Sequence, residues 1–308
     1  MENTRAKTTR NSLILLLTAT IWGMAFVSQS KGMDYMHPFT FNGVRSLIGA
    51  AGILVYILIS RKIAGDKAAK LDWKLNVRAG LLCGIFLTIA STLQQFGIKY
   101  TSVGKAGFIT TLYIIFVPMF GVFLKKKVAQ VVWAAAGMAA VGMYLLCMTE
   151  SLRLGAGDIM VFLCAIAFAI QIMTVDHYAA RIDGAVVSCI QFTVCGVVCC
   201  IGALIWGQPT FGQIQEGLGA LLYAGVLSCG VGYTLQIVGQ KGLNPTVAAL
   251  IMSLESVIAT ISGWIAYKIG FLSTDQTLTP RQIAGCVIVF AAVILVQLPP
   301  EWFRFGKK

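Results

Sequence analysis

Two stretches of the sequence repeat one another and decide how the chain folds. Residues 92–99 read TLQQFGIK, and residues 234–241 read TLQIVGQK. The spacing then holds without a gap, and three positions return at the same offset: Ala106, Ile109 and Leu112 recur as Ala248, Ile251 and Leu254. Chance is a poor explanation for so long a shared register, so we interpret the chain as two related halves.

The repeated stretches lie in a sequence far more apolar than that of a water-soluble protein. The chain has 308 residues, of which 57% are hydrophobic and 12% are charged, and its mean hydropathy is +0.81. Soluble domains carry roughly 25% charged residues. A soluble fold could not cover this much apolar surface, so lipid is the solvent that fits. The sequence therefore predicts an all-α integral membrane protein.

A membrane-spanning helix needs about 20 apolar residues, and the chain divides into ten such stretches. They cover residues 12–30, 38–60, 77–98, 103–124, 129–148, 157–177, 184–206, 217–239, 245–267 and 280–298. Several of them begin with a polar residue and a proline, which is typical of helix starts: His37-Pro38, Asn244-Pro245 and Thr279-Pro280. We therefore expect ten transmembrane helices.

The repeat divides the ten predicted spans into two sets of five. Because five is odd, the second set must cross the membrane in the opposite direction, which gives inverted repeats. We predict one five-helix repeat over residues 12–148 and a second over residues 155–298. Two copies that face opposite ways can exchange conformations, as in carriers that work by alternating access. The alternative is a duplication that only doubled a scaffold.

The basic residues predict the orientation of the chain. One side of the predicted spans would hold Arg5, Lys7, Arg10, Arg61, Lys62, Lys67, Lys70, Lys74, Arg78, Lys125, Lys126, Lys127, Arg181, Lys241, Arg304, Lys307 and Lys308. The other side would hold only Lys31, Lys99, Lys105, Arg153, Lys268 and Arg281. Cytoplasmic loops are enriched in such residues, so we expect a multi-pass protein of the cytoplasmic membrane with both termini in the cytoplasm. No signal-peptide cleavage site follows the first apolar run.

Several classes of function lack the residues they need. The formal charge is +12, but the basic residues lie between apolar runs instead of forming a face with aromatics, which argues against nucleic-acid binding. All nine cysteines fall in apolar stretches, there is no CxxC, and His37 and His177 are the only histidines, so we expect no metal, disulfide or cofactor. No nucleotide-binding GxxxxGK[ST] is present.

Ionisable residues are costly inside a bilayer, so each one deep in a span is a functional candidate. Glu255 is the clearest, because it follows Pro245 by about ten residues, which places it roughly 15 Å into the membrane. The repeat places Tyr113 at the equivalent position of the fourth span. We hypothesise that both contact a solute in a central cavity and that Glu255 exchanges protons. The alternative is a structural Glu255 paired with Arg45 or a glutamine.

Four further polar or aromatic residues are candidates to line the cavity. Arg45 lies about seven residues into its span, so it would either pair within the bundle or reach the headgroups. Gln94 and Gln236 are equivalent positions whose amides would bond to other helices or to a solute. Trp22 would either line the cavity or pack against a neighbouring helix.

Several motifs make the chain similar to the drug/metabolite transporter superfamily, in its EamA-type ten-span form. Residues 22–26 carry a Trp-Gly-x-x-Phe motif, and Arg45 stands where these proteins often have arginine. Residues 101–110 read TSVGKAGFIT and lead to Pro118, and residues 254–257 read LESV where the family has LEPV. Ser256 replaces the family's proline, which leaves the expected kink of the ninth span open. The motifs are informative only together and in register.

The resemblance implies a secondary transporter, an exporter of small metabolites, amino acids or drug-like solutes that works by alternating access. Its partners would be the solute and membrane lipid, with proton coupling through Glu255. One alternative is a membrane assembly subunit without transport. Another is a membrane-embedded lipid-modifying enzyme, but no HExxH- or HxxxxD-like spacing is present, so we expect no enzyme. The motifs carry no information on oligomeric state.

Overall fold

The structure, a computed structural model, describes residues 2–65, 71–125, 130–147, 155–273, 275–277 and 279–297. Within these ranges the regular elements are all helices. The first half contains α1 (Glu2–Gly32), α2 (Pro38–Ala64), α3 (Trp73–Ile98), α4 (Val103–Thr111), α5 (Tyr113–Phe123) and α6 (Gln130–Cys147). Some of the basic residues that predict the orientation lie outside the described ranges, among them Lys67, Lys126 and Arg304. The predicted repeat ends at residues 148 and 298 also lie outside them.

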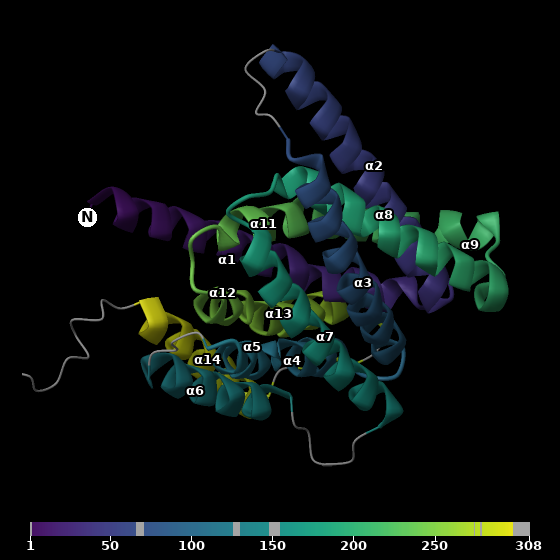
Figure 1. The fold of residues 1–308 in the computed structure, drawn as a ribbon. Helices are drawn as coiled ribbons and strands as arrows, with labels where there is room; N and C mark the ends of the chain where they lie inside the picture. Colours follow the sequence, from purple (N-terminus) through teal and green to yellow (C-terminus); the bar gives the residue numbers. More distant parts are fainter. Residues whose placement is uncertain are drawn as a thin grey trace, which may run out of the picture.

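The second half repeats this order with more interruptions. It contains α7 (Ala156–Tyr178), α8 (Gly184–Gly202), η2 (Ala203–Gly207), α9 (Phe211–Glu216), α10 (Leu218–Leu222), η3 (Tyr223–Gly232), α11 (Tyr233–Gln240), α12 (Pro245–Met252), α13 (Leu254–Lys268) and α14 (Pro280–Gln297). The two η elements are π-helical. Figure 1 shows the helices gathered in one bundle, with α6 and α14 side by side at its edge.

Within the described part of the chain, eight helical segments are long and apolar enough to cross a membrane. They cover Thr8–Gly32, Pro38–Ala64, Trp73–Ile98, Val103–Phe123, Ala156–Tyr178, Gly184–Gly207, Leu218–Gln240 and Pro245–Lys268. Each lies within a few residues of a predicted span, which confirms an all-helical, multi-pass membrane protein. The predicted fifth and tenth spans coincide with α6 and α14, whose described apolar stretches, Gln130–Gly142 and Pro280–Ala292, are shorter. The count of ten spans stays a prediction.

The helix starts follow the capping residues in the sequence. The His37 ring accepts a hydrogen bond from the Phe39 amide at 3.4 Å, directly before α2. Asn244 accepts one from the Thr246 amide at 2.9 Å, directly before α12. In both helices proline occupies the first turn, where its missing N–H costs no hydrogen bond. These two predicted helix starts are confirmed.

The two halves pack in a reciprocal way. Helix α3 packs against α7 and α8, and its counterpart in the second half, η3 with α11, packs against α1 and α2. Helices α12 and α13 contact α1, just as α4 and α5 contact α7. Helix α2 contacts its counterpart α8, and α6 contacts α14. Each contact therefore has an equivalent contact in which the first and second halves are interchanged. Such a pattern is expected when two repeats pack about a common axis.

The fourth and ninth spans are interrupted at corresponding places. Helix α4 ends at Thr111 before α5 begins at Tyr113, and α12 ends at Met252 before α13 begins at Leu254. At the second break, Ser253 Oγ donates to the Leu250 carbonyl at 2.7 Å, and Ser256 Oγ donates to the Ser253 carbonyl at 2.8 Å. Such side-chain bonds compete with the helical ladder and bend helices. The ninth span is thus interrupted although Ser256 stands in place of the proline.

Helix α2 and η3 approach each other through small residues. A methyl group added to Gly49 would lie 2.7 Å from the Cβ of Cys229 and 2.9 Å from the carbonyl oxygen of Gly225. Such contacts are shorter than van der Waals separation, so only glycine fits here. The sequence did not indicate the π-helical form of η3, a form that is frequent at functional sites.

Replacing Gly49 with alanine tests this contact. We expect Gly49→Ala to lower the free energy of unfolding by about 1–3 kcal/mol, because the added methyl group overpacks the contact between α2 and η3. Gly52→Ala, one turn along the same helix, is the matched control, because no described atom lies within 4 Å of the added methyl group. Thermal denaturation in detergent measures both, and an equal melting temperature for the two variants would contradict the account.

Candidate functional site

A small polar cavity lies between the two halves, in the middle of the bundle. Its volume is about 30 Å³. Its walls hold all six residues predicted as candidates from the sequence: Trp22, Arg45, Gln94, Tyr113, Gln236 and Glu255. The first half contributes four of its predicted spans to the wall, and the second half contributes three. The structure thus brings these residues around one space, while their contact with a solute stays a prediction.

Tyr113 and Glu255 join the two halves across this cavity. The Tyr113 hydroxyl donates a hydrogen bond to Glu255 Oε1 at 3.0 Å. The side chains are 2% and 3% exposed, so the bond is shielded from solvent. The residues are 142 positions apart, the offset of the repeat, and each lies in the first turn after a helix break. Equivalent positions of the two halves therefore meet each other directly.

The structure corrects one alternative for Glu255. The side chain pairs with Tyr113 and forms no ion pair with Arg45 or hydrogen bond with a glutamine among the described residues. Arg45 instead donates from Nε to Asn42 Oδ1 at 2.8 Å, and its guanidinium lies 5.4 Å from the centre of the Phe41 ring. With 5% of Arg45 exposed, its side chain stays in the bundle and does not reach the headgroups.

The two glutamines link helices, as one of their two interpretations proposed. Gln94 Nε2 donates to Thr110 Oγ1 at 3.2 Å and so connects α3 with α4. Gln236 Nε2 donates to Gln171 Oε1 at 3.2 Å and so connects α11 with α7. Both also line the cavity, so each side chain links two helices and also offers polar atoms to a solute.

Four buried polar atoms of the cavity-lining residues have no hydrogen-bond partner among the described residues. Two are donors, Trp22 Nε1 and Gln171 Nε2, and two are acceptors, Gln29 Oε1 and Gln236 Oε1. Trp22 packs its ring against Tyr233, with the ring centres 4.5 Å apart. A buried polar atom without a partner costs free energy, so a wall with both donors and acceptors favours a polar occupant.

Sequence reasoning missed several residues of the wall. Gln29 and Gln171 are amides within apolar spans, and a search for every such amide would have found them. Thr110 and Ser228 carry a weaker signal, because hydroxyl residues are common in membrane helices. Phe168 and Tyr233 carry none, since aromatic residues occur throughout the spans and only the fold brings these two together.

Removing the Tyr113 hydroxyl tests the bond between the halves. We expect Tyr113→Phe to lower the free energy of unfolding by about 1–3 kcal/mol, because the buried Glu255 carboxyl loses its hydrogen-bond donor. Tyr56→Phe is the matched control, since Tyr56 is 61% exposed on α2. Thermal melting in detergent compares the two, and the bond is unimportant if Tyr113→Phe melts at the wild-type temperature.

Comparison with known proteins gives a consistent result over nearly the whole chain. A relative in Archaeoglobus fulgidus, named an uncharacterized transporter, is 28% identical over 290 residues, which is 92% of this chain and 84% of that protein. The uncharacterized transporter YwfM of Bacillus subtilis is 24% identical over 295 residues, or 94% of each chain. A solved crystal structure superposes with a TM-score of 0.74 over 96% of this chain and 99% of the other. At 15% identity, that superposition shows the shared fold alone.

The sequence profile of one family matches the chain twice. The EamA-like transporter family profile covers residues 10–148 and again residues 155–298. Together with the membrane-length helices, these two matches cover the body of the bundle. The chain therefore belongs to the EamA-like transporter family and is a multi-pass membrane transporter.

Proposed function

We propose that the protein is a secondary transporter that exports small metabolites, amino acids or drug-like solutes across the cytoplasmic membrane by alternating access. The observation that carries this proposal is the central cavity, which lies between the halves and is bridged by Tyr113 and Glu255. Because these are equivalent positions of the repeat, both halves contact the same site. The direction of transport comes from the family resemblance.

The proposed transport cycle needs two states of similar energy. Reciprocal packing of the halves and the two family matches support two inverted five-helix repeats with ten spans and both termini in the cytoplasm. In such an arrangement each half can adopt the conformation of the other, which interchanges the open side. The breaks before Tyr113 and Leu254 provide places where the fourth and ninth spans can bend.

The volume of the cavity indicates that the described conformation is closed. About 30 Å³ is roughly the space of one water molecule. A metabolite is many times larger, so the halves must separate at this site before a solute can enter. The contact between Tyr113 and Glu255 is then a contact that breaks or rearranges in each cycle.

The chemistry of the wall supports a polar solute. Arg45 offers a buried cation and Glu255 a carboxyl group, and the two unpaired donors and two unpaired acceptors add hydrogen-bonding capacity. Trp22, Phe26 and Tyr233 supply apolar contact area around these groups. Small sites with a few polar groups among aromatic side chains are typical of solute binding.

Glu255 is the residue proposed to couple transport to protons. A carboxyl group in the membrane interior is rare and marks proton or ion pathways. Its bond to Tyr113 would be replaced by a bond to solute or a bound proton as the halves separate. Transport and protonation would then compete for, or share, the same carboxyl group.

Flux into proteoliposomes tests the proposed function. Wild-type protein should move at least one member of a panel of amino acids and metabolites, and the rate should respond to a pH gradient. Glu255→Gln should lose that response while folding normally, because the amide oxygen can still accept the hydrogen bond from Tyr113 but the amide does not take up or release a proton. Glu216→Gln, which removes an exposed carboxyl group on α9, is the matched control and should behave as wild type.

Two other results have defined meanings. Uptake that ignores the gradient in wild type and variant alike would indicate a facilitator and remove the proton role of Glu255. If folded protein moves no solute in a broad panel, and Glu255→Gln and Tyr113→Phe also leave cellular function intact, the non-transporting assembly subunit becomes the better account.

A further inference from the structure

A second and larger cavity lies away from the transport site, between the end of α2 and the start of α3. Its volume is about 610 Å³, and it shares no residue with the central cavity. Its walls come from α2, α3, the turn between α7 and α8, and the end of α11. Figure 1 shows the last turns of α2 rising away from the bundle beside this region. We call it the α2–α3 cavity.

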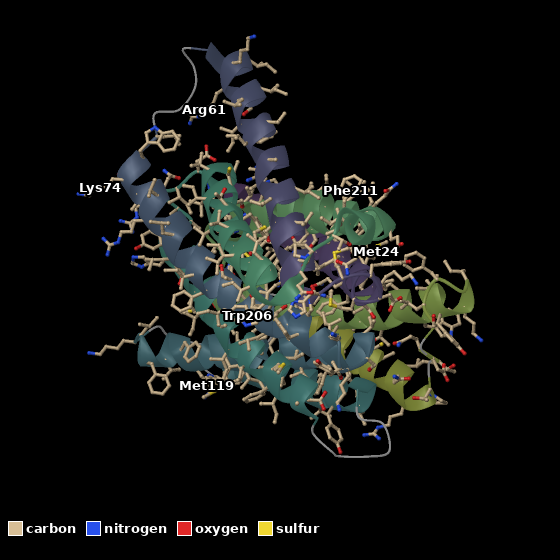
Figure 2. All side chains as sticks on the ribbon, turned by 90° about the vertical axis from the view of Figure 1, so that its right-hand side faces the viewer. Met24, Arg61, Lys74, Met119, Trp206 and Phe211 are labelled. Atoms are coloured by element: carbon tan, nitrogen blue, oxygen red, sulfur yellow. The ribbon has the colours of Figure 1, made fainter. Side chains whose placement is uncertain are left out.

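Among the described residues, three basic side chains line the α2–α3 cavity: Arg61, Arg181 and Lys241. Lys241 Nζ donates to the Ile182 carbonyl at 3.2 Å. The side chains of Arg61 and Arg181 make no hydrogen bond or ion pair with any described residue. Figure 2 shows Arg61 at the end of α2 and Lys74 at the start of α3, at the same end of the bundle. The cavity therefore holds two guanidinium groups that have no partner among the described residues.

The two acidic residues among the described lining residues cap helices. Asp72 Oδ1 accepts the Leu75 amide at 3.0 Å and caps α3. Asp183 Oδ1 accepts the Ala185 and Val186 amides at 3.0 and 3.2 Å and caps α8. Among the described residues neither carboxylate forms an ion pair with an arginine, and the three basic side chains of the lining outnumber the two acids. The site is left complementary to an anion.

The position of the cavity favours a lipid over a soluble anion. Tyr56 lines the cavity and is 61% exposed, and the nearby Ile59 and Ile63 of α2 are 54% and 82% exposed. On α3, which follows the lining residue Asp72, Val77 and Leu81 are 40% and 45% exposed. A free phosphate would gain nothing from these exposed apolar side chains, whereas the acyl chains of a lipid would pack against them.

We propose that the α2–α3 cavity binds an anionic phospholipid, with the headgroup phosphate at Arg61 and Arg181 and the acyl chains along the exposed apolar face of α2. Arginine binds phosphate through paired donors, and basic pockets between membrane helices accept anionic headgroups. On the predicted orientation this end of the bundle faces the cytoplasm. The proposal does not depend on which solute the central cavity carries.

Lipid binding to the purified full chain tests the proposal. Native mass spectrometry and thermal shift in neutral detergent would compare phosphatidylglycerol, phosphatidylcholine and inorganic phosphate. We expect phosphatidylglycerol to be retained and to raise the melting temperature more than phosphatidylcholine does. In Arg61→Gln/Arg181→Gln, its affinity should fall about thirtyfold, from about fivefold for each cationic side chain. Phosphate alone should bind far more weakly.

The control carries the same loss of charge outside the cavity. Lys62→Gln/Arg78→Gln removes two exposed basic side chains of α2 and α3 and should keep the wild-type preference. The single variants, Arg61→Gln and Arg181→Gln, should each show an intermediate loss, which covers the case of a double variant that folds poorly. The proposal is overturned by equal binding of the two lipids, by an equal loss in the control, or by phosphate binding as tightly as the lipid.

Discussion

A polar group inside a membrane must find its partner within the protein, because lipid offers none. This constraint explains where the polar side chains of the chain lie. Glu255 is held by Tyr113, Arg45 by Asn42, and Gln236 by Gln171, all in the interior of the bundle. Large apolar side chains such as Met24, Trp206 and Phe211 are left on the outside (Figure 2). The packing of the halves follows, since only their interface can enclose these groups.

The same interface contains three places where the backbone departs from a regular α-helix. The fourth and ninth spans break beside Tyr113 and Glu255, and the π-helical η3 carries Ser228 into the cavity wall. Hydroxyl groups near the breaks bond to neighbouring carbonyls, for example Thr111 to Phe108 and Ser253 to Leu250, and so reduce the loss of ladder bonds. Irregular backbone in a membrane protein is tolerated where it lines a cavity. The two helix breaks and η3 lie beside the central cavity.

Much of the fold could be predicted because membrane spans are long and because the repeated residues of the two halves keep the same spacing. Hydropathy placed the membrane-length helices, and the offset between Gln94 and Gln236 identified Tyr113 as the counterpart of Glu255. The direct bond between these two could not be predicted, because a repeat gives equivalence and not contact. A kink was expected only where the sequence has a proline. The ninth span has no proline at its break, where the Ser253 and Ser256 hydroxyls bond to backbone carbonyls instead. The π-helical elements η2 and η3 contact α2, and no local sequence pattern predicted their form.

Transport is proposed to occur at a cavity that is too small for a metabolite in this conformation and must enlarge as the halves separate around Glu255. A structure of the protein determined with its transported solute bound is the most direct measurement of that claim. We expect the solute to lie between the two halves, in contact with Glu255 and Arg45, in a cavity much larger than about 30 Å³ and with the Tyr113–Glu255 hydrogen bond broken or lengthened. A solute bound elsewhere, with the central cavity and this bond unchanged, would contradict it.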